Sequence, residues 1–426
     1  MQTISIFWFR RDLRLEDNTA LNKALLNGEP VLPLFIFDEQ ILSDLPNDDP
    51  RVNFIYENLQ VMNEKLSSYN TSILCLKGNP IEVWKELVES YSIKSVYVNK
   101  DYEPYARDRD QEIEALLGKN GVSFFSCKDQ VIHEENEVLK KDSTPYTVFT
   151  PYKNKWLELY KQKAPEHLVS NSNFHQNKIP FPSLDALGIE KSSIKVQEYN
   201  LSQIYKYSEI RDFPAVDATS YLSPHLRFGT VSVRTIIAAL KSSDEVFMSE
   251  LIWREFFMQI IFHFPKVVTG NFKSKYDGIE WLNNPEDFAN WCNGTTGYPM
   301  VDAGMRQLNK TGYMHNRVRM VTAGFLCKHL LIDWRLGEAY FAKKLLDFEL
   351  SSNNGNWQWA AGTGCDSAPY FRIFNPLSQF EKFDKSKAYV KKWIPEFETD
   401  AYPEPIVEHK YARNRALETY KKGLDG

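Results

Sequence analysis

The chain has 426 residues, enough for two domains, and its 43% hydrophobic content supports a substantial core. It lacks both an apolar run of about 18 residues and an N-terminal basic region followed by an apolar one. We therefore expect a soluble, cytoplasmic protein, monomeric by default. The five cysteines are scattered and form no CxxC pair, so we expect reduced thiols without a disulfide framework or a metal site. They are Cys75, Cys127, Cys292, Cys327 and Cys365.

The net charge of −5 is unevenly distributed along the chain. Residues 201–426 contain 28 Lys plus Arg against 26 Asp plus Glu, whereas residues 1–200 contain 23 against 30. The second half is therefore the better candidate for contact with a polyanion, although a local basic groove matters more than a sum over a domain.

Short apolar, β-rich runs occur at residues 4–9, 31–37, 72–76 and 95–99, separated by segments of helical character. This alternation predicts an α/β fold with a doubly wound, mostly parallel, Rossmann-like sheet over residues 1–130. No GxGxxG follows the first run, which disfavours a dinucleotide site of that kind. The charged residues 10–18 are either a salt-bridged connection or a functional loop.

Residues 131–200 are polar and rich in Asn, Ser and Pro, which is typical of an inter-domain connector on the surface. From residue 201 to 426 the hydrophobic period becomes helical, so we expect a larger all-α domain. The helix candidates are residues 231–242, 244–263, 301–310, 317–334 and 335–350.

Residues 353–376 combine two tryptophans and further aromatic residues with amides, Asp366 and Arg372, without the period of a plain helix or strand. Indole N–H groups and buried amides need hydrogen-bond partners, so the stretch either holds an aromatic polar ligand or is a core loop. We favour the ligand. The aromatic residues are Trp357, Trp359, Tyr370, Phe371 and Phe374.

Three further groups of residues are compatible with a site. Residues 219–224 offer hydroxyl groups before a helical stretch, where they would bind an anion or simply cap the helix. Glu250, Trp253 and Arg254 are spaced i, i+3 and i+4 and share one helical face, as Asn316, Arg319 and Met320 do. A solvated ion pair beside a core tryptophan is the alternative interpretation for the first of these triplets.

Residues 354–376, 296–320, 250–257 and 8–18 resemble the photolyase and cryptochrome flavoprotein family, most closely class I cyclobutane pyrimidine dimer photolyases. The resemblance covers most of the chain. It implies an enzyme, a carbon–carbon lyase, that repairs pyrimidine dimers in DNA by light-driven electron transfer from reduced, anionic FAD to a flipped-out dimer. The alternative is a cryptochrome photoreceptor, including the DASH type, without repair of duplex DNA.

The resemblance also assigns roles to individual residues, and Asn353, facing N5 of the flavin, and Met320 favour repair. The catalytic positions that it implies are Glu250, Trp253, Asn316, Met320, Asn353 and Trp359. FAD binding is implied for Tyr207, Thr219, Ser220, Ser223, Arg254, Arg319, Asp347, Glu349 and Asn353, with Glu349 standing where the family usually has Asp. Electron transfer is implied for Trp357, Trp334 and Trp281.

Contacts to DNA phosphates are expected from Arg211, Arg227, Arg317, Arg372 and Lys382. A second, antenna chromophore is left open. The alignment places Ala106 where folate-binding members carry an acidic residue, which disfavours folate and is compatible with another antenna or none.

Overall fold

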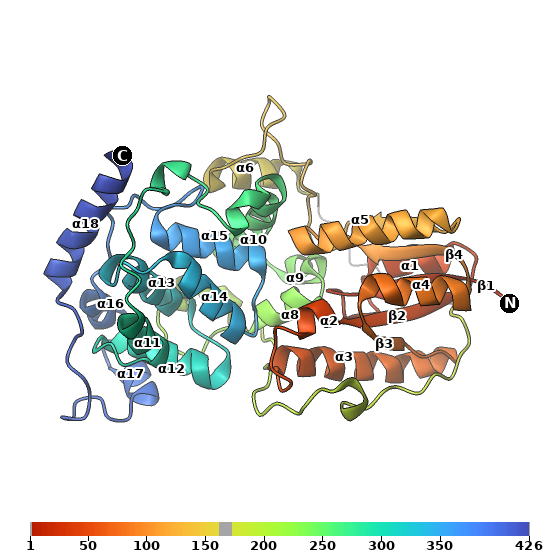
Figure 1. The fold of residues 1–426 in the computed structure, drawn as a ribbon, viewed down its shortest axis with the longest axis horizontal. Helices are drawn as coiled ribbons and strands as arrows, with labels where there is room; N and C mark the ends of the chain where they lie inside the picture. Colours follow the sequence, from red (N-terminus) through yellow and green to blue (C-terminus); the bar gives the residue numbers. More distant parts are fainter. Residues whose placement is uncertain (1, 162–172, 426) are drawn as a thin grey trace. The chain divides into compact units, whose positions relative to one another are not determined.

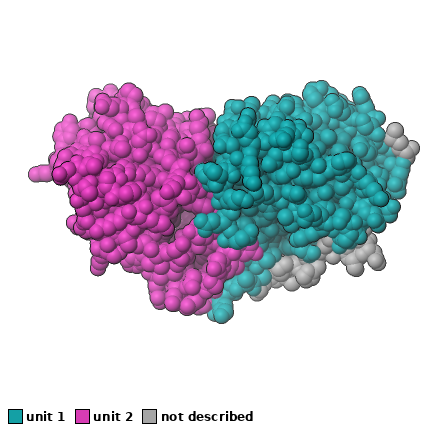
Figure 2. All heavy atoms as spheres, turned by 90° about the horizontal axis from the view of Figure 1, so that it is seen from below, with its two compact units in different colours: residues 1–138, 156–198, 222–242 teal, residues 139–155, 199–221, 243–426 magenta. Residues whose placement is uncertain are grey.

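The computed structural model describes residues 2–161 and 173–425. The chain forms two compact units (Figure 2), each made of segments that are not continuous in sequence. Unit 1 consists of residues 1–138, 156–198 and 222–242, and unit 2 of residues 139–155, 199–221 and 243–426. Residues 139–155, which belong to the expected connector, are therefore part of unit 2, while residues 162–172 of that connector lie outside the described residues.

Unit 1 contains a five-stranded parallel sheet in the order β3-β2-β1-β4-β5 (Figure 1). Its strands are β1 (Thr3–Phe9), β2 (Val31–Asp38), β3 (Leu74–Gly78), β4 (Ser92–Asn99) and β5 (Ser123–Cys127). Its helices are α1 (Thr19–Leu26), α2 (Glu39–Leu42), α3 (Pro50–Leu66), α4 (Pro80–Ser90), α5 (Pro104–Lys119), α8 (Leu222–Phe228) and α9 (Val233–Ala239). Helix α6 (Phe149–Leu159) begins in unit 2 and ends in unit 1.

The side chains of β1 alternate between two hydrophobic cores, as the period of a strand requires. Phe7 and Phe9 pack with residues of α1 and α3, whereas Ile6 and Trp8 pack with residues of α4 and α5. Both faces of the sheet are thus covered by helices, which explains why all the residues of β2 are buried. The predicted doubly wound α/β fold is confirmed.

Unit 2 is helical (Figure 1), and its largest core gathers side chains from several helices around Trp291 and Trp357. The helices of unit 2 are α7 (Tyr207–Ile210), α10 (Glu245–His263), α11 (Pro285–Asn293), α12 (Pro299–Thr311), α13 (Asn316–Gly324), α14 (Trp334–Lys344), α15 (Leu350–Ala361), α16 (Pro376–Phe383), α17 (Ala388–Trp393) and α18 (His409–Asp425). A π-helical turn, Phe325–His329, follows α13. The predicted all-α fold of the second part of the chain is confirmed, although residues 222–242 of the expected range 201–426 belong to unit 1. No described helix is long and apolar enough to cross a membrane.

Two glycines let α15 pack closely against its neighbours. A Cβ on Gly337 of α14 would lie 2.2 Å from the ring of Trp357, and one on Gly355 would lie 2.1 Å from the ring of Phe257. Both distances are far shorter than a carbon–carbon contact of about 3.5–4.0 Å. Helix α15 is therefore fixed tightly between α10 and α14.

The structure corrects one expectation about residues 353–376. Residues 353–361 belong to α15, although their sequence lacks the period of an amphipathic helix. The reason is that polar side chains of this helix, including Asn354 and Gln358, are buried and hydrogen-bonded to the carbonyl of Val267. A helix with buried polar residues on several sides gives no hydrophobic stripe.

Candidate functional site

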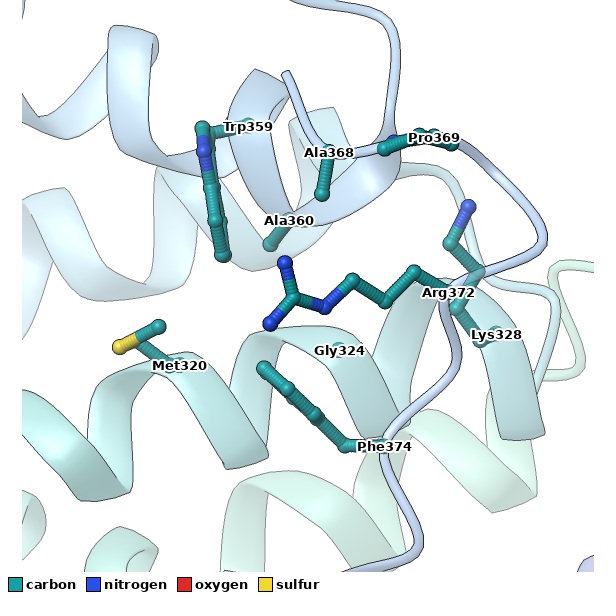
Figure 3. A pocket seen from close by; sticks show the side chains of 9 residues that line it. All are labelled: Met320, Gly324, Lys328, Trp359, Ala360, Ala368, Pro369, Arg372 and Phe374. Carbon is teal, nitrogen blue, oxygen red and sulfur yellow. The ribbon is translucent and has the colours of Figure 1, made fainter.

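A pocket in unit 2 lies between α13, α15 and the segment that follows α15 (Figure 3). Met320 and Trp359 form one side of it, and the guanidinium group of Arg372 points into it between Trp359 and Phe374. Four residues named in the sequence analysis, Met320, Trp359, Arg372 and Phe374, are thus brought together. The lining residues are Met320, Gly324, Lys328, Trp359, Ala360, Ala368, Pro369, Arg372 and Phe374.

Lys328 lines this pocket and was not anticipated from the sequence. It lies in the π-helical turn and is only 3% exposed. Its Nζ donates to the carbonyl of Ala361 at 2.6 Å, at the C-terminal end of α15, and lies 3.6 Å from the ring centre of Tyr420. Burial lowers the pKa of Lys328 to about 7.

Two ion pairs connect predicted site residues of α10 and α13 with the segment between α14 and α15. Arg254 of α10 lies 3.2 Å from the carboxylate of Glu349, which is 4% exposed. Arg319 of α13 donates to Asp347 at 2.9 Å and to the carbonyl of Met314 at 2.8 Å. The longer side chain of Glu349 therefore reaches a guanidinium group, and both pairs supply donors and acceptors in a partly buried region.

Asn353 is 9% exposed, and its side-chain amide donates to Glu338 of α14. The Nδ2 atom lies 2.7 Å from the Glu338 carboxylate Oε1 and 3.1 Å from the Glu338 backbone carbonyl. Burial raises the pKa of Glu338, and the hydrogen bond from Asn353 opposes this shift only in part. Because Nδ2 donates to two acceptors of one residue, these hydrogen bonds hold the orientation of the Asn353 amide.

The face of α10 that carries Glu250 and Trp253 makes separate contacts. Glu250 pairs with Arg211 at 2.6 Å, and the guanidinium group of Arg211 also lies 5.1 Å from the ring centre of Tyr207. Trp253 stacks on Phe149 with ring centroids 3.6 Å apart and an interplanar angle of 8°. Burial raises the pKa of Tyr207 to about 12, so its hydroxyl group stays protonated at neutral pH.

The predicted phosphate-binding segment is divided between the units. Thr219 and Ser220 belong to unit 2, whereas Ser223 lies in α8 of unit 1. Between them, Tyr221 has a φ of 51°, a left-handed backbone conformation that costs on the order of 1 kcal/mol for a residue with a bulky side chain. Its hydroxyl group donates to Asp217 at 2.9 Å, which helps to hold this conformation.

The three tryptophans of the predicted relay each pack against a different partner. The ring centroids of Trp357 and Trp291 are 6.1 Å apart, and those of Trp281 and Tyr420 are 5.9 Å apart. Trp334 donates its indole N–H to Asn271 at 2.9 Å. Trp357 and Trp334 are buried, and Trp281 is partly exposed. Trp291, which joins the same core, was not selected from the sequence.

The basic residues expected to contact phosphate lie in different surroundings. Arg317 pairs with Asp212 at 2.7 Å and lies over the ring of Phe383, while the exposed Lys382 lies near the same ring. Arg227 belongs to unit 1. Asn316, the first residue of α13, is exposed.

In unit 1 the charged loop of residues 10–18 forms a network of ion pairs. Arg10 pairs with Asp110, Arg14 pairs with Asp129, and Asn99 donates to Asp12 at 2.6 Å. The loop is therefore salt-bridged, as the first of the two interpretations expects. Ala106, the residue that argues against folate, is buried in α5. Among the described residues, no cluster of three or more His, Cys, Asp or Glu side chains is arranged to hold a metal ion.

Known families match both parts of this chain. The family model of the FAD-binding domain of DNA photolyase matches residues 247–400, which include α13, α15 and most of α10, and the DNA photolyase model matches residues 5–169. The deoxyribodipyrimidine photo-lyase of Escherichia coli K12 is 36% identical over the full length of both chains. The chain therefore belongs to the DNA photolyase family, and the enzyme class predicted from the sequence is confirmed.

Solved structures agree with this assignment. A class III photolyase from Agrobacterium tumefaciens superposes with a TM-score of 0.90 at 32% identity, covering 100% of this chain and 98% of the other. A photolyase from Sulfolobus tokodaii, whose crystal structure holds two FAD molecules, gives a TM-score of 0.87 at 35% identity, covering 98% and 99%.

FAD fits the chemistry of the residues in unit 2. The isoalloxazine ring presents donors and acceptors along its polar edge, and the partly buried side chains of Arg254, Arg319, Asp347, Glu349 and Asn353 supply both kinds of group. FAD is the cofactor of this helical unit, in agreement with the matched FAD-binding domain.

Proposed function

We propose that this photolyase repairs cyclobutane pyrimidine dimers in DNA, using blue or near-UV light. The observation that supports this proposal is the pocket where Met320, Trp359 and Arg372 meet (Figure 3). Its apolar and aromatic walls suit the faces of two joined pyrimidines, and the guanidinium group suits the phosphate or carbonyl oxygens beside them. Photolyases are a known example of enzymes that take the target base out of the duplex. A dimer could enter a recessed pocket only if it left the base stack in this way.

Bound FAD, in its reduced anionic form, would supply the light-excited electron that splits the dimer. The residues of this chain have the task of holding the two reactants. Tyr207, Thr219, Ser220 and Ser223 would bind the phosphate portion, and Arg254, Glu349, Arg319, Asp347 and Asn353 would bind the flavin ring. Because Nδ2 of Asn353 donates to Glu338, its carbonyl oxygen would be the atom that faces the ring.

On the substrate side, Glu250 would accept a hydrogen bond from the lesion, and Trp253 and Trp359 would stack on it, together with Met320 and Asn316. Arg211, Arg227, Arg317, Arg372 and Lys382 would contact phosphates. The tryptophans Trp357, Trp334 and Trp281 would return electrons to an oxidised flavin. The protein would act as a monomer, and an antenna chromophore other than folate is compatible with unit 1.

The test uses a duplex with one cyclobutane thymine dimer and the photoreduced holoenzyme, with absorbance followed under blue light and in the dark. Light-dependent recovery of thymine absorbance is the expected result, and a duplex with a (6-4) photoproduct should show none. If the flavin photoreduces normally but neither duplex recovers, the proposed repair function is wrong and a cryptochrome photoreceptor is favoured.

A further inference from the structure

Phe149 covers one face of Trp253. The two rings are almost parallel, with centroids 3.6 Å apart and an interplanar angle of 8°. Aromatic pairs generally prefer offset or edge-to-face arrangements, so such full overlap indicates that the surroundings hold both rings in place. Phe149 is 6% exposed, whereas Trp253 keeps part of its surface accessible.

The other neighbours of Trp253 also restrict its movement. The ring of Phe256 meets that of Trp253 edge-on, with centroids 5.5 Å apart, and the centroid of the Phe257 ring lies 5.4 Å from that of Trp253. Both phenylalanines belong to α10, as Trp253 does. Phe257 has little freedom because its ring lies against the backbone of α15 at Gly355, where even a Cβ would collide with it. Trp253 thus rests on a fixed aromatic support.

Phe149 is held by the segment that lines the pocket. It is the first residue of α6, so its backbone N–H has no acceptor within the helix. The carboxylate of Asp366 accepts this N–H at 3.0 Å. Asp366 precedes Ala368 and Pro369, which line the pocket of Met320 and Trp359. One carboxylate therefore connects the support of Trp253 with the pocket wall.

We propose that Phe149 is a positioning residue for lesion recognition: held by Asp366, it closes one face of Trp253 and fixes the orientation in which the remaining surface meets a pyrimidine. The inference rests on the proposed function, in which Trp253 stacks on the dimer. It gives residues 139–155 a part in substrate selection, beyond connecting the two units.

The test compares the holoenzyme with Phe149→Leu, Phe149→Tyr, Asp366→Ala and Asp366→Asn. Dissociation constants are measured for a duplex with one thymine dimer and for the undamaged duplex, with FAD content and urea unfolding as further readouts. Phe149→Leu leaves the ring of Trp253 in place but removes the ring that fixes its orientation, so it should lower the preference for the dimer roughly tenfold. Affinity for undamaged duplex and FAD content should not change.

The conservative variants separate positioning from general stability. Phe149→Tyr keeps the ring face and Asp366→Asn keeps an acceptor oxygen, so each should restore most of the preference lost in Phe149→Leu and Asp366→Ala. Phe125→Leu serves as a control because Phe125 also stacks on an aromatic residue, Tyr97, but lies in unit 1. It should leave the preference unchanged.

The outcomes distinguish the two proposals. If the wild-type protein shows no preference for the dimer, the proposed function is wrong. If it does show a preference and Phe149→Leu retains it, or loses affinity for both duplexes equally, the positioning role is wrong. Should Phe149→Leu fail to fold, the comparison of Asp366→Ala with Asp366→Asn decides, because neither changes an aromatic ring.

Discussion

The side-chain amide of Asn353 donates to the Glu338 carboxylate at 2.7 Å and to the Glu338 carbonyl at 3.1 Å, so that α14 fixes the amide of α15. These two hydrogen bonds affect both residues. Asn353 cannot rotate its amide without losing two hydrogen bonds. Glu338, whose pKa is raised by burial, has in Asn353 the donor that stabilises its charged form.

We predict that Asn353→Asp makes stability depend on pH. The change would place a second carboxylate beside Glu338, and two like charges at this distance raise the pKa of the pair in the folded state. A raised folded pKa means that ionisation destabilises the fold at higher pH and that this penalty disappears as pH falls. Urea unfolding should show a deficit of about 1–3 kcal/mol against the wild type at pH 8 that shrinks toward pH 5.

Asn353→Ser is the matched control for this prediction. It also removes the amide that stabilises the charged form of Glu338 but adds no second charge, so its deficit should shrink less toward pH 5 than that of Asn353→Asp. Equal pH profiles for the two variants would contradict the interpretation that the carboxylate of Glu338 is the partner of Asn353.

For Lys328 we predict that stability depends on pH in the opposite direction. Its pKa of about 7 in the fold lies below the value of about 10 in the unfolded chain, so between these values the unfolded state binds more protons. Stability from this group therefore rises with pH above 7, by at most about 1.4 kcal/mol per pH unit. Lys328→Met removes the titrating group.

The variant Lys328→Met should thus gain stability relative to the wild type at pH 7, and the gain should shrink as pH approaches 10. Tyr420 still donates to the carbonyl of Ala361 at 2.8 Å, so this oxygen keeps a partner in the variant. Urea unfolding at pH 7 and pH 9 measures the difference. Lys385→Met is the control, because Lys385 is exposed, and its stability relative to the wild type should not depend on pH.

The apolar runs at residues 4–9 and 31–37 predict the sheet, because central strands are covered on both faces. The sequence analysis does not predict β5 (Ser123–Cys127). This edge strand is short and mostly accessible, so it lacks an apolar run. In unit 2 the resemblance singled out Met320 and Trp359, and Arg372 was expected to contact DNA phosphate; the structure brings the three to one pocket.

Other parts of the site could not be predicted, because the pattern gives no signal for them. Glu338 looks like an ordinary polar residue of α14, and Lys328 follows an apolar stretch as a helix-ending lysine would. Their roles arise from contacts with Asn353 and Ala361, 15 and 33 positions away. Phe149 is linked to Asp366 over 217 positions, and no local period records such a contact.

The pair of Glu250 and Arg211 gives a prediction about repair. Its side chains are 34% and 27% exposed, and such accessible pairs contribute only about 0–1 kcal/mol to stability. Glu250→Ala should therefore retain FAD and unfold like the wild type, while repair of the dimer under blue light falls about tenfold for the loss of a charged hydrogen bond. Glu245→Ala, at an exposed position of the same helix, should repair normally. Loss of FAD from Glu250→Ala on purification would show that this residue belongs to the cofactor site.

The ion pair between Arg254 and Glu349 is more deeply buried, and breaking it should have a larger effect. Arg254→Ala leaves the carboxylate of Glu349, 4% exposed, without this charge partner. Removing one member of a buried pair costs about 3–5 kcal/mol, so the free energy of unfolding should fall by this amount and the bound FAD fraction should fall with it. Glu349→Asp keeps the charge but shortens the side chain, so it should lose less stability and less FAD than Arg254→Ala.

As a comparison, Lys422→Ala breaks a pair with Glu280 whose side chains are both about 70% exposed, and it should change the free energy of unfolding by less than about 1 kcal/mol. If Arg254→Ala and Lys422→Ala unfold alike, the buried pair does not stabilise the fold, and FAD retention must depend on other residues.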